Sequence, residues 1–179
     1  MTEDAPAETT RATQDDDELY AAGLLSWDGL PGIPASAGAI LRDRRGRILL
    51  LKPTYKSGWT IPGGVMEADG ETPWQACRRE ILEEIGVHVE SGRLAAVDTR
   101  PGTARKAMGL RFLFDCGVLD DAQVAAIRVQ AEEVSEHAFL APAEALQLLR
   151  PAVRRRVAAV LQATHFRYLE DGLPVDGVS

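Results

Sequence analysis

Three glutamates in the stretch GGVMEADGETPWQACRREILEEIGV, residues 63–87, could do chemistry together. Glu80, Glu83 and Glu84 fall in the last two turns of a predicted helix, where the negative end of the helix dipole and their mutual repulsion disfavour them. A solvated surface face accounts for most charge runs, but these acids cluster on one edge without alternating lysines. Carboxylates on consecutive turns can instead hold Mg²⁺ or Mn²⁺ and leave coordination positions for water and a phosphate. The stretch therefore favours metal-assisted phosphate chemistry.

The helix that carries these glutamates has well-marked ends. Thr72 is a good N-cap, Pro73 suits the first helical position, and Gln75 completes a capping box with Thr72. Gly86 supplies a C-terminal stop. At about 100° per residue, one side of this helix must be buried, and it consists of Trp74, Cys77, Ile81 and Ile85. The glutamates gather on an adjacent side.

These residues resemble the Nudix box, whose usual form is G(x5)E(x7)REU(x)EE(x)GU with U a bulky aliphatic residue. The matching positions are Gly64, Glu71, Arg79-Glu80-Ile81, Glu83-Glu84 and Gly86-Val87. Six residues rather than five separate Gly64 from Glu71, so one residue is inserted in the loop before the helix, where length changes are best tolerated. The lead-in GAILRDRRGRILLLKPTYKSGWTIPGG is also similar to that of the family, and the resemblance covers about residues 33–163.

The resemblance implies a fold and a set of ligands. The fold would be of the α/β class, a Nudix-like α/β/α sandwich with a mixed β-sheet between helices. The metal ligands would be Glu80, Glu83, Glu84 and the carbonyl of Gly64. Arg79 would orient the glutamates, and Glu71 would pair near Arg79 and hold structure.

The resemblance also implies a reaction. Water activated by Mg²⁺ (or Mn²⁺) would attack a phosphorus of a nucleoside diphosphate linked to another group X and split the phosphoanhydride. Catalysis would rest on Glu80, Glu83 and Arg79. A base that works near neutral pH is needed, and crowding could raise the pKa of one carboxylate of the box toward that range. A later loop offers other candidate bases, namely Glu132, Glu133 and Glu136, although solvated loop acids would look the same.

Three residues outside the box are candidates for substrate binding. Trp59 could stack on a base or belong to the core, and Lys52 could meet phosphates. Arg111 stands in an apolar strand and could point into a cleft. Tyr55 and Lys56 are weaker candidates of the same kinds. Near the start of a late helix, Arg150 with Arg154–Arg156 forms a basic patch that we expect to be solvated.

The rest of the chain predicts strands interleaved with helices. We expect two strands joined by a turn at residues 44–46, and a short strand in WTIPGG that ends at Pro62. Further strands are expected within residues 92–100, 108–119 and 135–141, and helices within 119–129, 141–149 and 151–166. Such alternation is typical of a mixed sheet covered by helices.

Length and charge limit the organisation. A chain of 179 residues with 45% apolar content suits one well-cored domain. Residues 1–18 hold seven acidic residues and one arginine, so the remainder is nearly neutral despite a net charge of -7. We expect a disordered acidic tail over 1–18, a single domain over 19–165 and a loose C-terminal tail over 166–179.

This balance of charge gives no support for a nucleic-acid or membrane partner. No segment approaches the roughly 20 apolar residues of a bilayer span, so a cytoplasmic location is expected. Because members of the family that the chain resembles are often dimers, a homodimer is a further expectation.

Other functions stay open at this level. A metal- or nucleotide-binding sensor module without turnover is the first alternative. A structural domain with a merely solvated acidic face is the second, and an isomerase acting on an allylic diphosphate is the most remote.

Overall fold

The protein is described by a computed structural model over residues 32–104 and 106–178. The compact unit spans Ile33–Ser179. The acidic tail predicted over residues 1–18 lies outside the described residues, as does the first part of the domain predicted to begin at residue 19.

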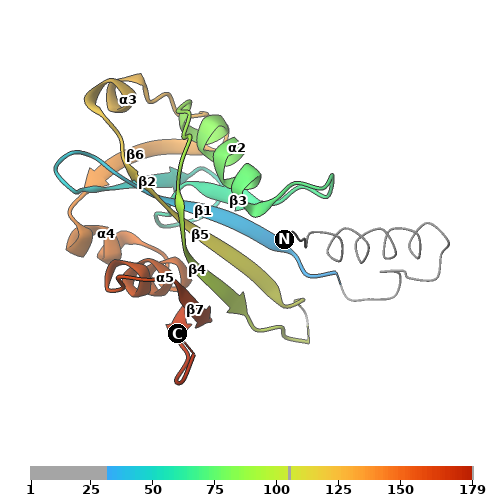
Figure 1. Ribbon diagram of the computed structural model, residues 1–179. Helices are drawn as coiled ribbons and strands as arrows, with labels where there is room; N and C mark the ends of the chain where they lie inside the picture. The colour runs from blue at the N-terminus through green and yellow to red at the C-terminus, as the bar shows by residue number, and fades with distance from the viewer. Residues whose placement is uncertain (1–31, 105, 179) are drawn as a thin grey trace, which may run out of the picture. The chain divides into compact units, whose positions relative to one another are not determined.

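Eight strands of the described residues form one mixed sheet (Figure 1). The strands follow one another in the order β6-β2-β1-β5-β4-β7-β8, and β3 pairs with β1 off this path. Neighbours are antiparallel except for β1 with β5 and β4 with β7, which are parallel. The bounds are β1 Ala35–Arg42, β2 Ile48–Pro53, β3 Gly63–Val65, β4 Arg93–Arg100, β5 Gly109–Val118, β6 Val134–Leu140, β7 Arg167–Glu170 and β8 Leu173–Pro174.

Helices cover both faces of this sheet, as Figure 1 shows. On one side lie α2 (Pro73–Ile85) and α3 (Asp121–Ala126), and on the other lie α4 (Pro142–Leu148) and α5 (Pro151–Leu161). Each side has its own apolar core. Ile81 and Ile85 of α2 pack into one core, and Val153 and Val157 of α5 pack into the other. The predicted α/β/α sandwich with a mixed sheet is confirmed.

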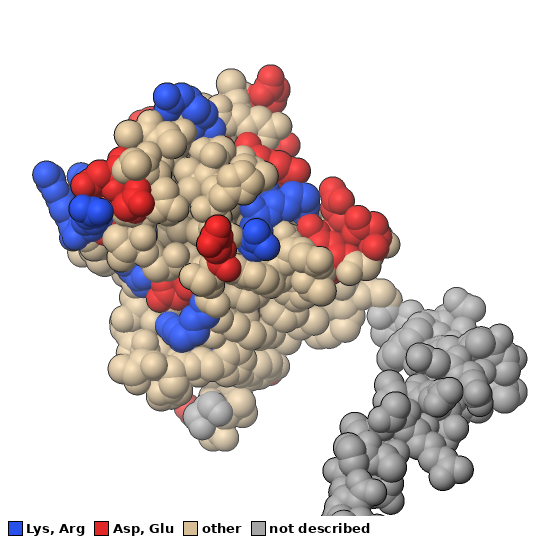
Figure 2. Space-filling model, turned by 45° about the horizontal axis from the view of Figure 1, so that its top comes forward, with Lys and Arg blue, Asp and Glu red and all other residues tan. Residues whose placement is uncertain are grey.

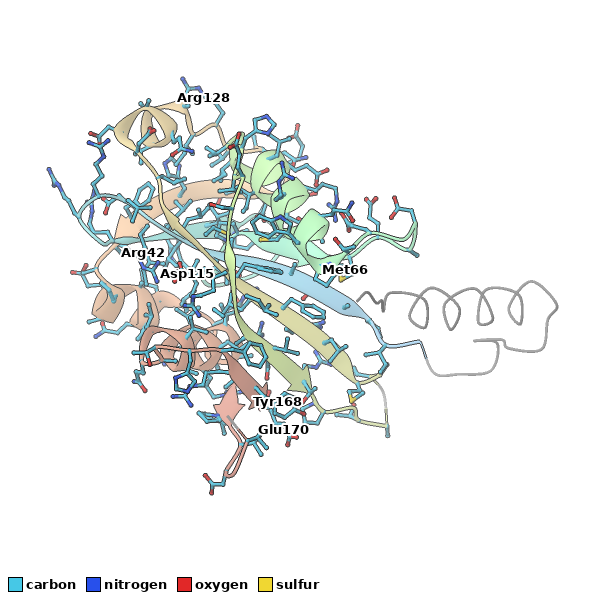
Figure 3. The ribbon with its side chains drawn as sticks, viewed as in Figure 1. Arg42, Met66, Asp115, Arg128, Tyr168 and Glu170 are labelled. Atoms are coloured by element: carbon cyan, nitrogen blue, oxygen red, sulfur yellow. The ribbon has the colours of Figure 1, made fainter. Side chains whose placement is uncertain are left out.

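The first hairpin forms where the sequence predicted it. Asp43 holds the turn because its Oδ1 accepts hydrogen bonds from the backbone N–H groups of Arg45 and Arg47, at 3.0 and 2.9 Å. Gly46 takes the left-handed conformation that the turn needs, with φ of 74°. Farther along the sheet, Arg42 of β1 donates to Asp115 of β5 at 2.7 Å, and the two side chains meet in Figure 3. The central parallel pair is thereby tied together at its end.

The strand expected in WTIPGG is displaced. Trp59 and Thr60 form only isolated bridges, and the strand itself begins after Pro62, at Gly63. Glycine at position 63 allows β3 to pair closely with β1, because a side chain there would collide with the backbone of Ala37 on that strand. Strand β3 therefore lies against β1 and beside α2.

The prediction of a loose tail over residues 166–179 is wrong for the first part of this segment. Residues 167–170 form β7, which pairs with β4, and Leu169 is fully buried in the core on the α5 side. Tyr168 and Glu170, labelled in Figure 3, share a hydrogen bond of 3.1 Å between the Tyr168 hydroxyl and Glu170 Oε1. A four-residue strand shows little alternation, and its partner is about 70 residues away, so local pattern could not reveal it.

The surface shows no dominant charge on the face in Figure 2, where acidic and basic side chains are interspersed. That face offers no continuous basic stripe of the kind that follows a nucleic-acid backbone. Among the described residues, no helix is both long enough and apolar enough to cross a bilayer.

Candidate active site

The helix α2 positions most of the predicted site residues. Thr72 caps it, the Thr72–Gln75 capping box is present in both directions, and Gly86 ends it in the left-handed conformation with φ of 70°. The predicted bounds of this helix are confirmed. Its buried side faces the sheet, so the neighbouring edge brings the glutamates to the border between α2 and strands β1 and β3.

Arg79 connects the glutamates of this helix with the loop before it. Its Nε donates to Glu71 Oε1 at 2.8 Å, and its Nη2 donates to Glu71 Oε2 at 3.1 Å. Its Nη1 donates to Glu80 Oε1 and Glu83 Oε2, both at 3.0 Å. One guanidinium thus fixes three carboxylates, which is the orienting position that the resemblance implies for it.

The inserted residue is absorbed in the loop before α2. Glu71 turns back to accept from the backbone N–H of Glu67 at 2.9 Å, and Gly70 has φ of 91°. The side chain of Asp69 accepts from the Glu71 N–H at 3.1 Å. The loop therefore closes on itself, and the register of Glu71 with Arg79 is kept.

Glu84 is the most buried carboxylate of the set, with 8% of the residue exposed. Its Oε2 accepts a hydrogen bond of 2.7 Å from the backbone N–H of Gly63. Glu80 lies nearby, because a Cβ built on Gly64 would overlap the Glu80 carboxylate. A side chain at position 64 would displace the Glu80 carboxylate, and glycine leaves the backbone there open to the glutamates.

A cavity of about 350 Å³ lies in front of this group. From the box it is lined by Gly63, Gly64, Glu80 and Glu84. The opposite side of the lining comes from β5 and α5. Glu83 is half-exposed, points to Arg79 and does not line the cavity.

Comparison with known proteins agrees with this geometry. The NUDIX domain family profile matches residues 32–161. An uncharacterised Nudix hydrolase of Pseudomonas aeruginosa is 33% identical over 140 residues, which cover 74% of this chain and 73% of that protein. The chain belongs to the Nudix hydrolase family. Its members generally need divalent metal ions.

Two further matches place the chain among Nudix proteins without fixing its substrate. A MutT-like protein of Streptomyces ambofaciens is 41% identical over 61 residues, which are 34% of this chain and only 38% of that relative's own length. The structure of the NUDIX domain of Shewanella oneidensis NrtR complexed with ADP ribose has a TM-score of 0.64 at 15% identity, over 82% of this chain and 97% of the other. That likeness concerns the fold.

Burial and crowding shift the proton equilibria of the Nudix glutamates. Desolvation raises the pKa of Glu84 to about 8, the Gly63 hydrogen bond opposes this rise, and the charges of Glu80 and Glu133 add to it. Desolvation also raises the pKa of Glu80, against the effect of Arg79. The Arg79 hydrogen bonds lower the pKa of Glu71. Among the described residues, Glu84 therefore has no cationic partner, and the single cation at Glu80, Arg79, does not offset the desolvation of that carboxylate.

The fit of a divalent ion to this Nudix site can be judged from the donors. The described residues contain no group of three or more His, Cys, Asp or Glu side chains already arranged to hold a metal ion. The reason is local, since Arg79 draws Glu80 and Glu83 to itself and Gly63 engages Glu84. The donor chemistry nevertheless fits a hard cation, because two desolvated carboxylates face one cavity beside an open glycine backbone.

Other predicted residues divide into two groups. Arg111, Tyr55, Lys56 and Glu133 line the cavity. The predicted substrate contacts Trp59 and Lys52, and the candidate bases Glu132 and Glu136, do not. Trp59 packs against the core on the α5 side. Lys52 Nζ lies 3.3 Å from Glu136 Oε2, so these two half-exposed side chains pair with each other.

Two residues at the cavity were not expected there. Arg150 and Arg156 were assigned to a solvated basic patch, yet both line the cavity, whereas Arg154 and Arg155 of the same patch do not. Sequence spacing alone does not tell which arginines of this run reach the cavity. That distinction depends on which face of α5 is buried. The run of four arginines was the feature of the sequence that could have pointed to these two residues.

Proposed function

We propose that this chain hydrolyses a phosphoanhydride bond of a nucleoside diphosphate linked to another group, with Mg²⁺ or Mn²⁺ as cofactor. The observation that carries the proposal is the convergence of buried Glu84 and partly buried Glu80 on one cavity beside Gly64. Burying two negative groups side by side is costly unless a cation neutralises them. Phosphate oxygens are the natural second partner of such a cation.

The side chains have distinct parts in this reaction. Glu80, Glu83, Glu84 and the Gly64 carbonyl would hold the ion, which when bound neutralises phosphate charge and acidifies water. Arg79 positions Glu80 and Glu83, and Glu71 in turn fixes Arg79. Glu133 lines the cavity from the loop before β6 and is better placed than Glu136 to accept the proton of the attacking water.

The test is release of phosphate-containing product from a panel of nucleotides with Mg²⁺. The variants are Glu80→Gln and Glu84→Gln, and the matched control is Glu90→Gln, an exposed residue outside this cavity. We expect each box variant to lower kcat by about 100-fold or more, with folding retained in circular dichroism. Wild-type rates in both box variants would refute the assignment of the site.

A pair of variants tests the base. Glu133→Gln should lower kcat because it removes the carboxylate that accepts the proton of the attacking water, whereas Glu136→Gln should leave kcat unchanged. Equal effects of the two substitutions would argue against Glu133.

A sensor without turnover is the second candidate. The inserted residue in the box is the observation that motivates it. Calorimetry on the same panel decides between the two, because tight nucleotide binding without any released product would replace the hydrolase with a sensor. A cytoplasmic location, a homodimer and the absence of a nucleic-acid partner stay predictions.

A further inference from the structure

Three arginines line the cavity together with Glu80 and Glu84. Arg111 of β5, Arg150 at the start of α5 and Arg156 within α5 all line it. The cavity therefore has an acidic end made by α2 and a basic end made by α5 and β5. A substrate that spans the cavity meets both.

The four arginines at positions 150 and 154–156 differ in their hydrogen-bond partners. Arg154 donates to the backbone carbonyls of Leu149 and Gln147, at 3.1 and 3.4 Å from its Nη2. Arg155 donates to Asp171 Oδ2 at 2.6 Å. These two are satisfied by the protein and stay outside the cavity lining.

The two arginines that do reach the cavity are less well satisfied. Nε of Arg150 is buried and has no hydrogen-bond partner among the described residues. Nε of Arg156 lies 3.0 Å from Asp98 Oδ2, but the pair lacks the alignment of a hydrogen bond. Asp98 is itself buried and already accepts from the backbone N–H of Gly172 at 2.7 Å.

Charge is unbalanced at this end of the cavity. Arg111 donates from Nη1 to the carbonyls of Leu110 and Pro34, at 2.7 and 3.4 Å, and forms no ion pair within the described residues. Asp98 is the only carboxylate paired with any of the three cavity arginines in the described part of the chain. Burial lowers the pKa of Arg111 and Arg156, and repulsion from neighbouring arginines adds to this effect. Only Arg156 of the three cavity arginines has a carboxylate partner in the described part of the chain, and an added anion would relieve the repulsion that Arg156 receives from Arg111 and Arg150.

The loop over this end holds Arg150 in place. A Cβ built on Gly58 would lie 3.0 Å from Cγ of Arg150, so the loop backbone packs closely on the arginine stem. The same loop contributes Tyr55 and Lys56 to the cavity. The basic end is therefore supported by packing, which a freely solvated patch would not need.

We propose that Arg111, Arg150 and Arg156 bind an anionic group, phosphate or carboxylate, on the part of the substrate remote from the cleaved bond. This inference rests on the proposed function and narrows its substrate class to nucleoside diphosphates whose group X carries a negative charge of its own. The planar fork of an arginine matches both anions, and two or three forks in one cavity select strongly for them.

The experiment compares substrates that differ only in the remote anion. One pair is UDP-glucuronate with UDP-glucose, where a carboxylate replaces a hydroxymethyl group. The other pair is ADP-ribose that bears a further phosphate on its terminal ribose and ADP-ribose itself. The first pair tests a carboxylate as the remote anion, and the second tests a phosphate. We expect kcat/KM to favour the charged member of at least one pair by about 10-fold or more. No preference in either pair would overturn the proposal.

Variants then assign the preference to the arginines. Arg150→Gln should reduce the preference to within about threefold of unity, because it raises KM for the charged substrate more than KM for the neutral one. Arg111→Gln should act in the same direction. Arg156→Lys retains a charge beside buried Asp98 and should reduce the preference without loss of folding. Arg154→Gln is the matched control on the same helix and should leave the preference intact, and an unchanged preference in Arg150→Gln would sink the proposal.

A binding measurement tests the proposed basic subsite independently of whether the protein hydrolyses any substrate. Inorganic phosphate is titrated into metal-free protein while the Nε–H signals of arginine are followed by NMR. Shifts that are lost in Arg150→Gln but kept in Arg154→Gln support the basic subsite even if no substrate is hydrolysed. Hydrolysis of charged and neutral substrates at equal kcat/KM would leave the proposed function standing and reject the subsite.

Discussion

Glu84 is the carboxylate of the described residues whose surroundings disfavour its charged form most clearly. It is nearly buried, its carboxylate accepts one backbone hydrogen bond from Gly63, and the charges around it are mainly negative. Gly63 can make that bond only because it lacks a Cβ at a φ of 135°. The residue is therefore destabilising in its charged form unless a cation is bound.

The stability of the metal-free protein should depend on pH through this residue. The pKa of Glu84 is raised from 4.5 to about 8 in the folded protein. Between these values the folded state holds a proton that the unfolded chain releases, so the free energy of unfolding falls as pH rises from about 4.5 to 8 and levels off above. Glu84→Gln should remove that slope and stabilise the protein at pH 8 by up to a few kcal/mol, on the order of 1 kcal/mol for each pH unit across which the folded state retains the proton.

Urea unfolding in EDTA at pH 5, 6.5 and 8 measures this effect. Glu90→Gln, an exposed substitution of the same chemical kind, is the control and should retain the wild-type slope. Parallel pH profiles for wild type and Glu84→Gln would show that Glu84 ionises normally.

Among the elements, α2 could be predicted closely because its signals are local. Thr72, Gln75 and Gly86 act within one turn of the helix end, and the contact of Arg79 with Glu83 is one turn long. The hydrogen bond between Glu84 and Gly63 spans 21 residues and could not be predicted in this way. The same holds for Arg150 and Arg156, whose approach to the cavity depends on how α5 packs on the sheet.

The N-cap of α2 provides a test at this scale. Thr72→Ala should lower the free energy of unfolding by about 1 kcal/mol, because it leaves the Gln75 N–H and the start of the helix without a side-chain partner. Thr72→Ser keeps the hydroxyl and should stay near wild type. Chemical denaturation measures both variants, and a Ser variant as unstable as the Ala variant would mean that the methyl group of Thr72, not the cap, matters. Activity should change little, since the end of the helix that carries Glu80, Glu83 and Glu84 is about two turns away.

At the scale of the whole molecule, the sandwich places two independent cores on either side of one sheet, and the cavity draws on both. Its acidic end belongs to the α2 side and its basic end to α5. The resemblance to the Nudix family implied the sandwich, and the alternating strands and helices indicated only a mixed sheet covered by helices. They could not predict that α5 and the C-terminal strand complete it, because β7 is short and pairs with β4 across the length of the domain.

The C-terminal strand should therefore matter for stability and for the basic end together. Leu169 is fully buried against the α5 side, and the turn after β7 brings the Gly172 N–H to Asp98, which pairs with Arg156. Leu169→Ala should lower the free energy of unfolding by about 2–5 kcal/mol, the usual cost of removing a buried leucine side chain. Val178→Ala, exposed in the same segment, is the control and should stay within about 0.5 kcal/mol of wild type.

Guanidinium unfolding measures the difference, and the substrate comparison adds a second readout. If β7 supports the basic end, Leu169→Ala should also weaken the preference for a charged group X while the rate on the neutral substrate falls less, because Asp98 and Arg156 lose support before the α2 glutamates do. A Leu169→Ala variant as stable as wild type would mean that residues 166–179 behave as the loose tail that the sequence predicted. A destabilised variant with an unchanged preference would instead show that β7 contributes only to the core and that Asp98 holds Arg156 without support from β7.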